Sequence, residues 1–153
     1  MSINADREGH TYAAAAPYQV SREAVRDFAA AVKADHPAHS DVEAARSLGH
    51  PDLVAPPTFA VVVAQRAEAA AVTDEEAGIE FSRVVHAEER FTHHAPITAG
   101  ETLTAQTTLQ RIRTMGSGAM VTTVTEVHTE DGSPRSTVTS SLLVRADETE
   151  EDL

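Results

Sequence analysis

The chain has 153 residues, the size of one domain, and its 41% apolar and 24% charged residues are typical of a globular protein with a continuous core. It contains no cysteine, which excludes disulfides, thiolate metal sites and a cysteine nucleophile. Its net charge of −12 disfavours binding to nucleic acid. We also predict no membrane span, because no run of about 18 apolar residues occurs. Residues 1–10 lack the apolar segment of a secretion signal, so we expect a cytoplasmic protein.

Two helices are predicted first. Ser21 is a good N-cap, and the apolar residues that follow it lie at i, i+3, i+4 and i+7, which is one face of a helix: Val25, Phe28, Ala29 and Val32. We expect Pro37 to end this helix, because the residue before a proline is pushed away from helical geometry. Asp41 is expected to cap a shorter helix that ends at Gly49.

A third helix is predicted from Phe59 to Val72. The double proline Pro56-Pro57 cannot lie inside a helix, but it suits an extended lead-in and a first turn. The residues after it are nearly all apolar as far as Gln65, and a helix that is apolar on every side is usually buried. We therefore expect this helix to lie at the centre of the fold.

After Gly78 the pattern changes to the period of two that is typical of strands. An alternating segment runs from Phe81 to Phe91, and by its parity His86 and Arg90 share one face. Three threonine- and valine-rich strands follow, at about 101–113, 119–130 and 135–146. Gly116, Gly118 and the pair Asp131-Gly132 mark the turns between them. The pattern predicts an α+β fold, with an antiparallel sheet wrapped around a long central helix.

Three strings of residues carry a resemblance to a known family. They are the first helix from Val20 to Val32, the lead-in from Asp52 to Phe59, and the strand and turn from Arg83 to Leu103. In this order they resemble the MaoC-like dehydratases, which have the hot-dog fold, and more closely their FAS1-like actinobacterial branch. The resemblance runs from about residue 9 to 146. In that branch, a subunit with the catalytic residues is paired with one that shapes the acyl channel.

The family's (R)-specific hydratases carry the motif Asp-x-Asn-Pro-x-His, in which the acid and the base converge on one water. Pro37 aligns this motif with residues 34–39 and places Ala34 at the aspartate position, His36 at the asparagine position and His39 at the histidine position. Asp35 lies one residue away from the motif's aspartate, which on a helix is a rotation of about 100°. Two alternatives follow: the chain has no catalytic activity on its own, or it is an active variant that uses Asp35 with His39. His39 also fits a plain surface or capping role.

The resemblance places the substrate thioester at the amino end of the third helix. Unpaired amides at a helix amino end polarise a carbonyl, and we expect them to come from Phe59 and Ala60. The predicted substrate-binding residues are Pro57, Thr58, Phe59, Ala60 and Val63, with His86 and Arg90 at the channel rim or a subunit interface. The small residues from Ala60 to Ala64 either leave room for an acyl chain or only permit tight packing.

These expectations describe one hot-dog domain over residues 1–146 and a disordered acidic tail over 147–153. The first hypothesis is the substrate-binding subunit of a (3R)-hydroxyacyl-ACP or -CoA dehydratase in fatty-acid metabolism, with a MaoC-like partner that supplies catalysis. The second is a homodimeric (R)-enoyl-CoA hydratase that uses Asp35 and His39, and the third is a non-enzymatic acyl-thioester binding protein. No cofactor and no metal are expected. The acyl chain length and the carrier, ACP or CoA, stay open.

Overall fold

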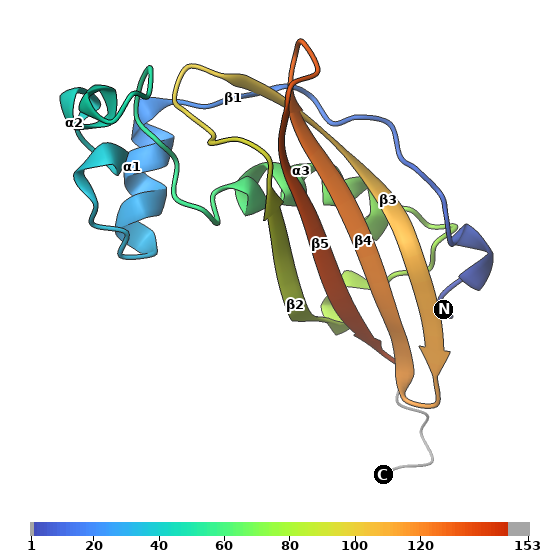
Figure 1. Ribbon diagram of the computed structural model, residues 1–153. Coiled ribbons are helices and arrows are strands. Elements are labelled where there is room, and N and C mark those ends of the chain that lie inside the picture. The colour runs from blue at the N-terminus through green and yellow to red at the C-terminus, as the bar shows by residue number, and fades with distance from the viewer. Residues whose placement is uncertain (1, 147–153) are drawn as a thin grey trace.

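The computed structural model describes residues 2–146 (Figure 1). The predicted acidic tail, residues 147–153, lies outside these described residues. Within them, no helix is both long enough and apolar enough to cross a membrane. The elements in chain order are η1 (Ala5–Arg7), β1 (Tyr18–Gln19), α1 (Arg22–Ala31), η2 (Pro37–His39), α2 (Val42–Ser47), α3 (Ala60–Val72), η3 (Phe81–Arg83), β2 (Val84–His93), β3 (Thr102–Met115), β4 (Gly118–Thr129) and β5 (Pro134–Arg145).

The strands form one antiparallel sheet in the order β1-β3-β4-β5-β2. The strands β3, β4 and β5 form the predicted meander, and the sheet curves across α3, which lies behind it in Figure 1. The helices α1 and α2 are grouped together at one end of the sheet (Figure 1). This arrangement confirms the expected α+β hot-dog architecture.

The central helix is held by small side chains. Its buried residues are Ala60, Val63, Ala64, Ala67, Glu68 and Ala71, which lie on the face toward the sheet. Because alanine has no atoms beyond Cβ, the sheet approaches the helix closely and its leucine and valine side chains fill the space between the layers. Leu109, Val121 and Leu142 are each at most 1% exposed. The prediction of a buried helix over this segment is confirmed, and Glu68 is its one charged buried residue.

The first helix begins as predicted but ends earlier. Ser21 caps it, because its side chain accepts a hydrogen bond from the Ala24 amide. It ends at Ala31, where Lys33 adopts a left-handed φ of 58° and the amide of Ala34 donates to the Ala29 carbonyl. This closed carboxyl-terminal turn ends the helix, so the prediction that Pro37 does so is wrong.

The predicted strand from Phe81 needs two corrections. Residues Phe81–Arg83 form a 3₁₀ turn, and β2 begins at Val84. The second correction is a β-bulge: His86 lies opposite Leu142, but Glu88 lies opposite Ser141, so Ala87 is the extra residue. A bulge reverses the alternation of faces beyond it. The residues before and after Ala87 therefore do not follow the single parity predicted from the sequence.

Candidate functional site

The segment that leads into α3 is fixed on both sides. Val54 forms an isolated bridge with Thr98, the Ala55 amide donates to the Ile97 carbonyl (2.8 Å), and the Val54 amide donates to the Ala38 carbonyl (3.0 Å). These bonds connect the lead-in to the loop before β3 and to η2. The segment that opens the central helix is therefore placed by backbone hydrogen bonds, which do not depend on side-chain identity.

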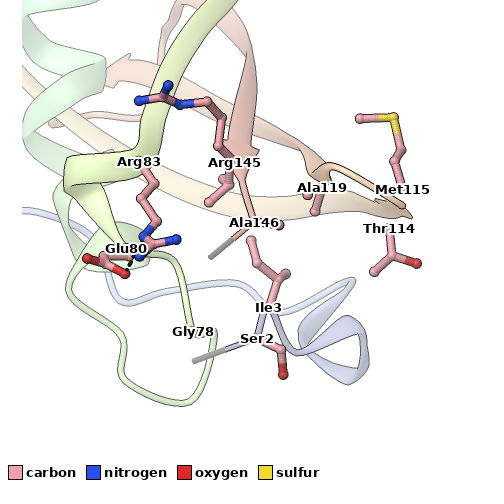
Figure 2. Close-up of a pocket in the computed structure, with 12 residues that line it drawn as sticks. Ser2, Ile3, Gly78, Glu80, Arg83, Thr114, Met115, Ala119, Arg145 and Ala146 are labelled. Carbon is pink, nitrogen blue, oxygen red and sulfur yellow. Dashed lines mark ion pairs between the residues drawn. The ribbon is translucent and has the colours of Figure 1, made fainter. Parts of the chain in front are cut away.

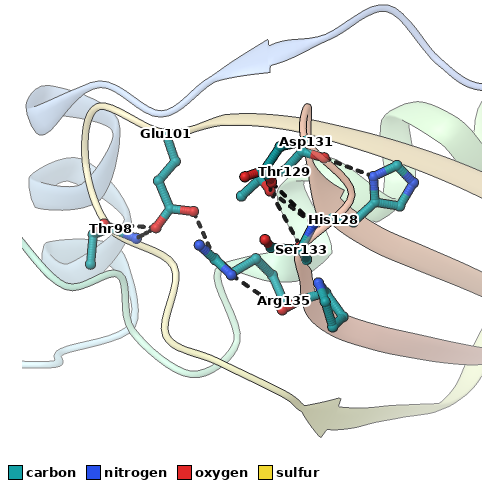
Figure 3. A network of polar contacts seen from close by, with 8 residues as sticks. Thr98, Glu101, His128, Thr129, Asp131, Ser133 and Arg135 are labelled. Atoms are coloured by element: carbon teal, nitrogen blue, oxygen red, sulfur yellow. Dashed lines mark hydrogen bonds and ion pairs between the residues drawn. The ribbon is translucent and has the colours of Figure 1, made fainter.

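The loop on one side of this lead-in is held by a charged network (Figure 3). Glu101 accepts hydrogen bonds from the Thr98 amide (2.9 Å), the Thr98 hydroxyl (2.7 Å) and Arg135 Nε (2.7 Å). Both charged side chains are largely buried, with exposed fractions of 17% for Glu101 and 20% for Arg135. Charge-assisted hydrogen bonds of this kind are stronger than neutral ones, so the network locks the loop to β5.

An open cavity of about 390 Å³ lies against this lead-in, and its walls are mostly apolar. It is lined by Val54, Ala55, Pro56, Pro57, His93, His94, Ala95, Pro96 and Ile97. Of the predicted substrate-binding residues, only Pro57 lines this cavity. Phe59, Ala60 and Val63 are 1–2% exposed and belong to the core, and Thr58 is exposed.

The amides at the start of α3 differ from the expectation in one respect. Phe59 donates its amide to the Pro56 carbonyl (2.9 Å), so that N–H is already used within the turn. The amides of Thr58 and Ala60 donate to no other residue of the described part of the chain. The available donors at the amino end of α3 are therefore those of Thr58 and Ala60.

His39 is hydrogen-bonded to Val54, which lines the same cavity. Its Nδ1 lies 2.5 Å from the Val54 carbonyl oxygen, and since a carbonyl can only accept, Nδ1 carries the proton. In the neutral ring Nε2 is then an unprotonated acceptor, which is the form that a general base requires. His36 has the opposite tautomer, because its Nδ1 accepts a hydrogen bond from the Ala38 amide (3.1 Å). The two ring centroids are 6.1 Å apart.

The proposed acidic partner of His39 is not held in the same way. Asp35 is exposed, and no hydrogen bond or ion pair joins it to another residue in the range 2–146. Ala34, at the family's aspartate position, is half-buried and closes α1. The structure thus presents one oriented histidine without a fixed carboxylate beside it.

The bulge at Ala87 separates His86 from Arg90. His86 lies opposite the buried Leu142 and shares the inner face of the sheet with Glu89, whose Oε2 is 3.5 Å from His86 Nε2. Arg90 lies opposite Thr139 on the outer face and pairs there with Glu88 (2.8 Å). The prediction that His86 and Arg90 share one face of the strand is therefore wrong, and their role at a channel rim or subunit interface stays a prediction.

Sequence reasoning missed a group of polar residues between α3 and the sheet. Glu68 of α3 is 6% exposed and accepts a hydrogen bond from the Thr123 hydroxyl (2.5 Å). Glu89 of β2 accepts one from the Ser140 hydroxyl (2.8 Å). The signal for Glu68 was present, since it lies four residues after Ala64 and three before Ala71, in phase with the buried face of the helix.

Burial raises the pKa of Glu89 above its ordinary value, and the nearby charge of Glu68 raises it further. The Ser140 hydroxyl and His86 act in the opposite direction. The inner face of β2 is therefore a place where a carboxyl holds its proton more tightly than it does in water.

A second cavity of about 280 Å³ lies beside the β3–β4 hairpin and the start of the described chain. Figure 2 shows Arg83 and Arg145 at its wall, with Arg83 Nε 2.9 Å from Glu80 Oε2. None of the predicted site residues lines it. Of these two cavities, only the one beside the lead-in to α3 is lined by a predicted site residue, Pro57.

Comparison with known proteins identifies the family. The model of the FAS1-like, dehydratase domain region matches residues 7–138. A UPF0336 protein of Clavibacter michiganensis subsp. michiganensis is 45% identical over 148 residues, which are 97% of this chain and 99% of that protein.

Two solved structures agree with this match. One is a chain of the C-terminally truncated HadBC (3R-hydroxyacyl-ACP dehydratase) complex of Mycobacterium tuberculosis. It has a TM-score of 0.81 and 32% identity over 90% of this chain and 97% of that chain. A MaoC-like dehydratase gives 0.83 and 31%, over 92% of this chain and 42% of that one. The chain therefore belongs to the FAS1-like dehydratase region family and has the hot-dog fold of the MaoC-like dehydratases.

Proposed function

We propose that this chain is the substrate-binding subunit of a (3R)-hydroxyacyl-thioester dehydratase in fatty-acid metabolism, and that a MaoC-like partner supplies the catalytic aspartate and histidine. The observation that carries the proposal is at the motif itself. Ala34 takes the place of the acid, and Asp35 is exposed without a partner in the described chain. Similarity to a chain of the HadBC complex supports the pairing of two hot-dog subunits.

The residues of this chain are suited to holding a thioester. The amino end of α3 offers the amides of Thr58 and Ala60, and the partial positive charge of the helix favours a carbonyl that gains negative charge. Dehydration removes the α-proton of the acyl group and expels the 3-hydroxyl as water, so negative charge collects on that carbonyl oxygen. The apolar cavity beside Pro57 lowers the local dielectric and strengthens this stabilisation.

The open edge of β2 is the surface that we assign to the partner. Within residues 2–146, β2 is the last strand of the sheet and pairs only with β5, so its other edge has unpaired backbone groups there. Phe81 and Val85 lie on or next to this edge, with 73% and 48% of their surface exposed. A second hot-dog subunit, either a MaoC-like protein or a second copy, would cover both features.

The tautomer of His39 favours a second candidate, a self-sufficient (R)-specific hydratase. Its Nε2 has no hydrogen-bond partner within residues 2–146, and Asp35 lies four positions before His39 in the chain. The third candidate, a non-enzymatic acyl-thioester binding protein, requires only the cavity and the amides. These candidates differ in what the chain does alone.

An assay of crotonyl-CoA hydration distinguishes the three candidate functions. We expect no turnover by the purified chain, and turnover when it is co-expressed and purified with a MaoC-like protein from its own host. Turnover by the chain alone that His39→Ala abolishes, and that the control His50→Ala leaves intact, would establish the self-sufficient enzyme instead. Thioester binding with neither partner nor turnover would leave the binding protein. The absence of both binding and partner would refute the proposed function.

A further inference from the structure

Three arginines at one end of the sheet have no carboxylate partner. Arg111 and Arg113 of β3 and Arg145 of β5 are exposed, and no hydrogen bond or ion pair joins their side chains to another residue in the range 2–146. Arg66 lies over the ring of Tyr18. The remaining arginines form ion pairs with carboxylates: Arg7, Arg22, Arg26, Arg46, Arg83, Arg90 and Arg135. In a chain of net charge −12, the three unpaired arginines therefore form a local positive surface.

The strand register places these three side chains on the same face of the sheet. Arg113 lies opposite Met120, and Met120 lies opposite Leu143, so these three side chains share a face. Arg111 is two residues before Arg113, Arg145 is two residues after Leu143, and no register shift falls in either interval. Residues of the opposite parity are buried, at 8%, 2% and 3% exposure: Ile112, Ala119 and Val144. Arg111, Arg113 and Arg145 thus lie on the outer face, away from α3, and we call them the outer arginine patch.

Beside the patch, the outer face of the sheet is hollowed. A groove of about 420 Å³ is lined by Glu8, Glu88, Arg90, Gln110, Arg111, Thr122, Thr139 and Ser141. Its two carboxylates already have partners, because Glu8 accepts from the Ile112 amide (2.8 Å) and Glu88 accepts from Arg90 (2.8 Å). Threonine and serine hydroxyls donate to carboxylates, and an arginine binds one through two parallel hydrogen bonds. The outer face is therefore suited to an extended acidic segment.

The continuation of the chain itself is an acidic segment of the required length. Residues 147–153 follow directly after Ala146, and β5 ends beside the β3–β4 hairpin, where Arg145 lies opposite Gly118 (Figure 1). These seven residues include five carboxylates: Asp147, Glu148, Glu150, Glu151 and Asp152. Seven extended residues span about 23 Å. With strands about 4.8 Å apart and a rise of about 3.4 Å per residue, the Cα atoms of Arg113 and Arg111 lie about 12 and 17 Å from that of Arg145. The whole patch is therefore within reach.

We propose that residues 147–153 bind to the outer arginine patch of their own chain, with their carboxylates paired to Arg111, Arg113 and Arg145. The bound segment covers arginines that have no other partner in the described chain. It also competes for them with any external acidic or phosphate-bearing molecule. This inference goes beyond the proposed function and does not rest on it, because the patch lies on the face of the sheet that is turned away from α3.

The first test is thermal unfolding of the full chain at low salt and at 1 M NaCl. One variant neutralises the acidic segment with Asp147→Asn, Glu148→Gln, Glu150→Gln, Glu151→Gln and Asp152→Asn together. The negative charges of a chain at −12 repel one another, so neutralising an unbound segment should raise Tm or leave it unchanged. Neutralising a bound segment should instead lower Tm by about 2–4 °C at low salt. At 1 M NaCl, where the Debye length is about 3 Å, this loss should largely disappear.

A second variant removes the patch with Arg111→Gln, Arg113→Gln and Arg145→Gln. It should lower Tm by a similar amount, and the combination of both variants should cost no more than either alone, because the same pairs are lost. Additive losses would contradict direct pairing between the segment and the patch. The control is Asp27→Asn with Glu130→Gln, which removes two exposed carboxylates without partners in residues 2–146 and should not lower Tm.

A spin label locates the segment directly, since the chain has no cysteine of its own. A nitroxide attached to the variant Thr149→Cys should broaden the amide signals of Arg111 and Arg113 in nuclear magnetic resonance spectra at low salt. At 1 M NaCl, and in the variant without the three arginines, broadening should be confined to residues next to Ala146.

Several results would overturn the inference. A Tm that rises or stays the same after neutralisation of residues 147–153 would mean that the patch is left to an external anion. Broadening on β3 that survives the loss of the arginines would show that charge pairing does not hold the segment. Broadening in a mixture of the spin-labelled chain and an isotope-labelled chain without nitroxide would assign the bound segment to a second copy, against binding within one chain.

Discussion

Phe59 is the side chain that fastens the amino end of the central helix. It is 1% exposed and contacts Phe28 of α1 edge to face at 5.4 Å between ring centroids, and Tyr18 of β1 at 6.2 Å. The change Phe59→Ala removes a whole buried ring and both aromatic contacts. Truncations of this kind cost about 3–5 kcal/mol, and the contacts place this site in the middle of that range, so we expect a loss of about 4 kcal/mol.

Urea unfolding followed by far-ultraviolet circular dichroism measures this loss. For a domain of this size, about 4 kcal/mol corresponds to a decrease in Tm of roughly 8–16 °C. Phe81→Ala is the matched control, because the Phe81 side chain is 73% exposed and its removal should change the free energy of unfolding by less than about 0.5 kcal/mol. A loss below about 1.5 kcal/mol for Phe59→Ala, or an equal loss for the two variants at low protein concentration, would refute the assignment of Phe59 to the core.

Three other changes test separate parts of the structure. Burial raises the pKa of Glu89, so the folded chain binds the proton of this carboxyl more tightly than the unfolded chain does. At neutral pH the ionised carboxyl therefore lowers the stability of the folded chain. This cost disappears at pH values below the ordinary pKa of 4.5, where the carboxyl is protonated in both states. Glu89→Gln should therefore raise Tm at pH 7 but not at pH 4, and an equal effect at both values would contradict this reasoning. Lys33→Gly relieves a left-handed φ of 58° and should stabilise by about 0.5–1 kcal/mol in urea unfolding, whereas a loss would show that the turn is not strained. Glu101→Ala removes three hydrogen bonds and should cost about 2–3 kcal/mol by the same measurement. The exposed control Glu43→Ala should cost under about 0.5 kcal/mol, and similar costs for the two would contradict a structural role for the network.

Most of the architecture followed from periodicity. The segment from Phe59 to Val72 is long, apolar and preceded by two prolines, so its helix was predictable. The turn at Asp131-Gly132 was predictable because glycine is suited to a positive φ, here 89° at Gly132. These features depend on residues that are neighbours in the chain, so the sequence pattern alone predicts them.

The features that escaped prediction depend on contacts between distant residues. The first helix ends at a lysine in a left-handed conformation, a position where glycine is the usual signal. The amide of Phe59 donates to the Pro56 carbonyl within a turn, and no sequence pattern predicts this hydrogen bond. The pairing of Glu68 with Thr123 joins residues 55 positions apart in the chain, and only the packed sheet brings them together.

The extra residue in β2 determines the environments of two chemically identical neighbours. Glu88 and Glu89 have the same side chain, yet Glu88 is exposed to solvent and Glu89 faces the protein interior. The reason is that the register against β5 shifts between His86 and Glu88. If Ala87 were instead paired one-to-one with Ser141, the two environments would be exchanged, turning Phe91 toward water and Arg90 toward the central helix. Deleting Ala87 would remove the extra residue but keep every existing pair with β5, so Glu88 and Glu89 should each keep their present environment.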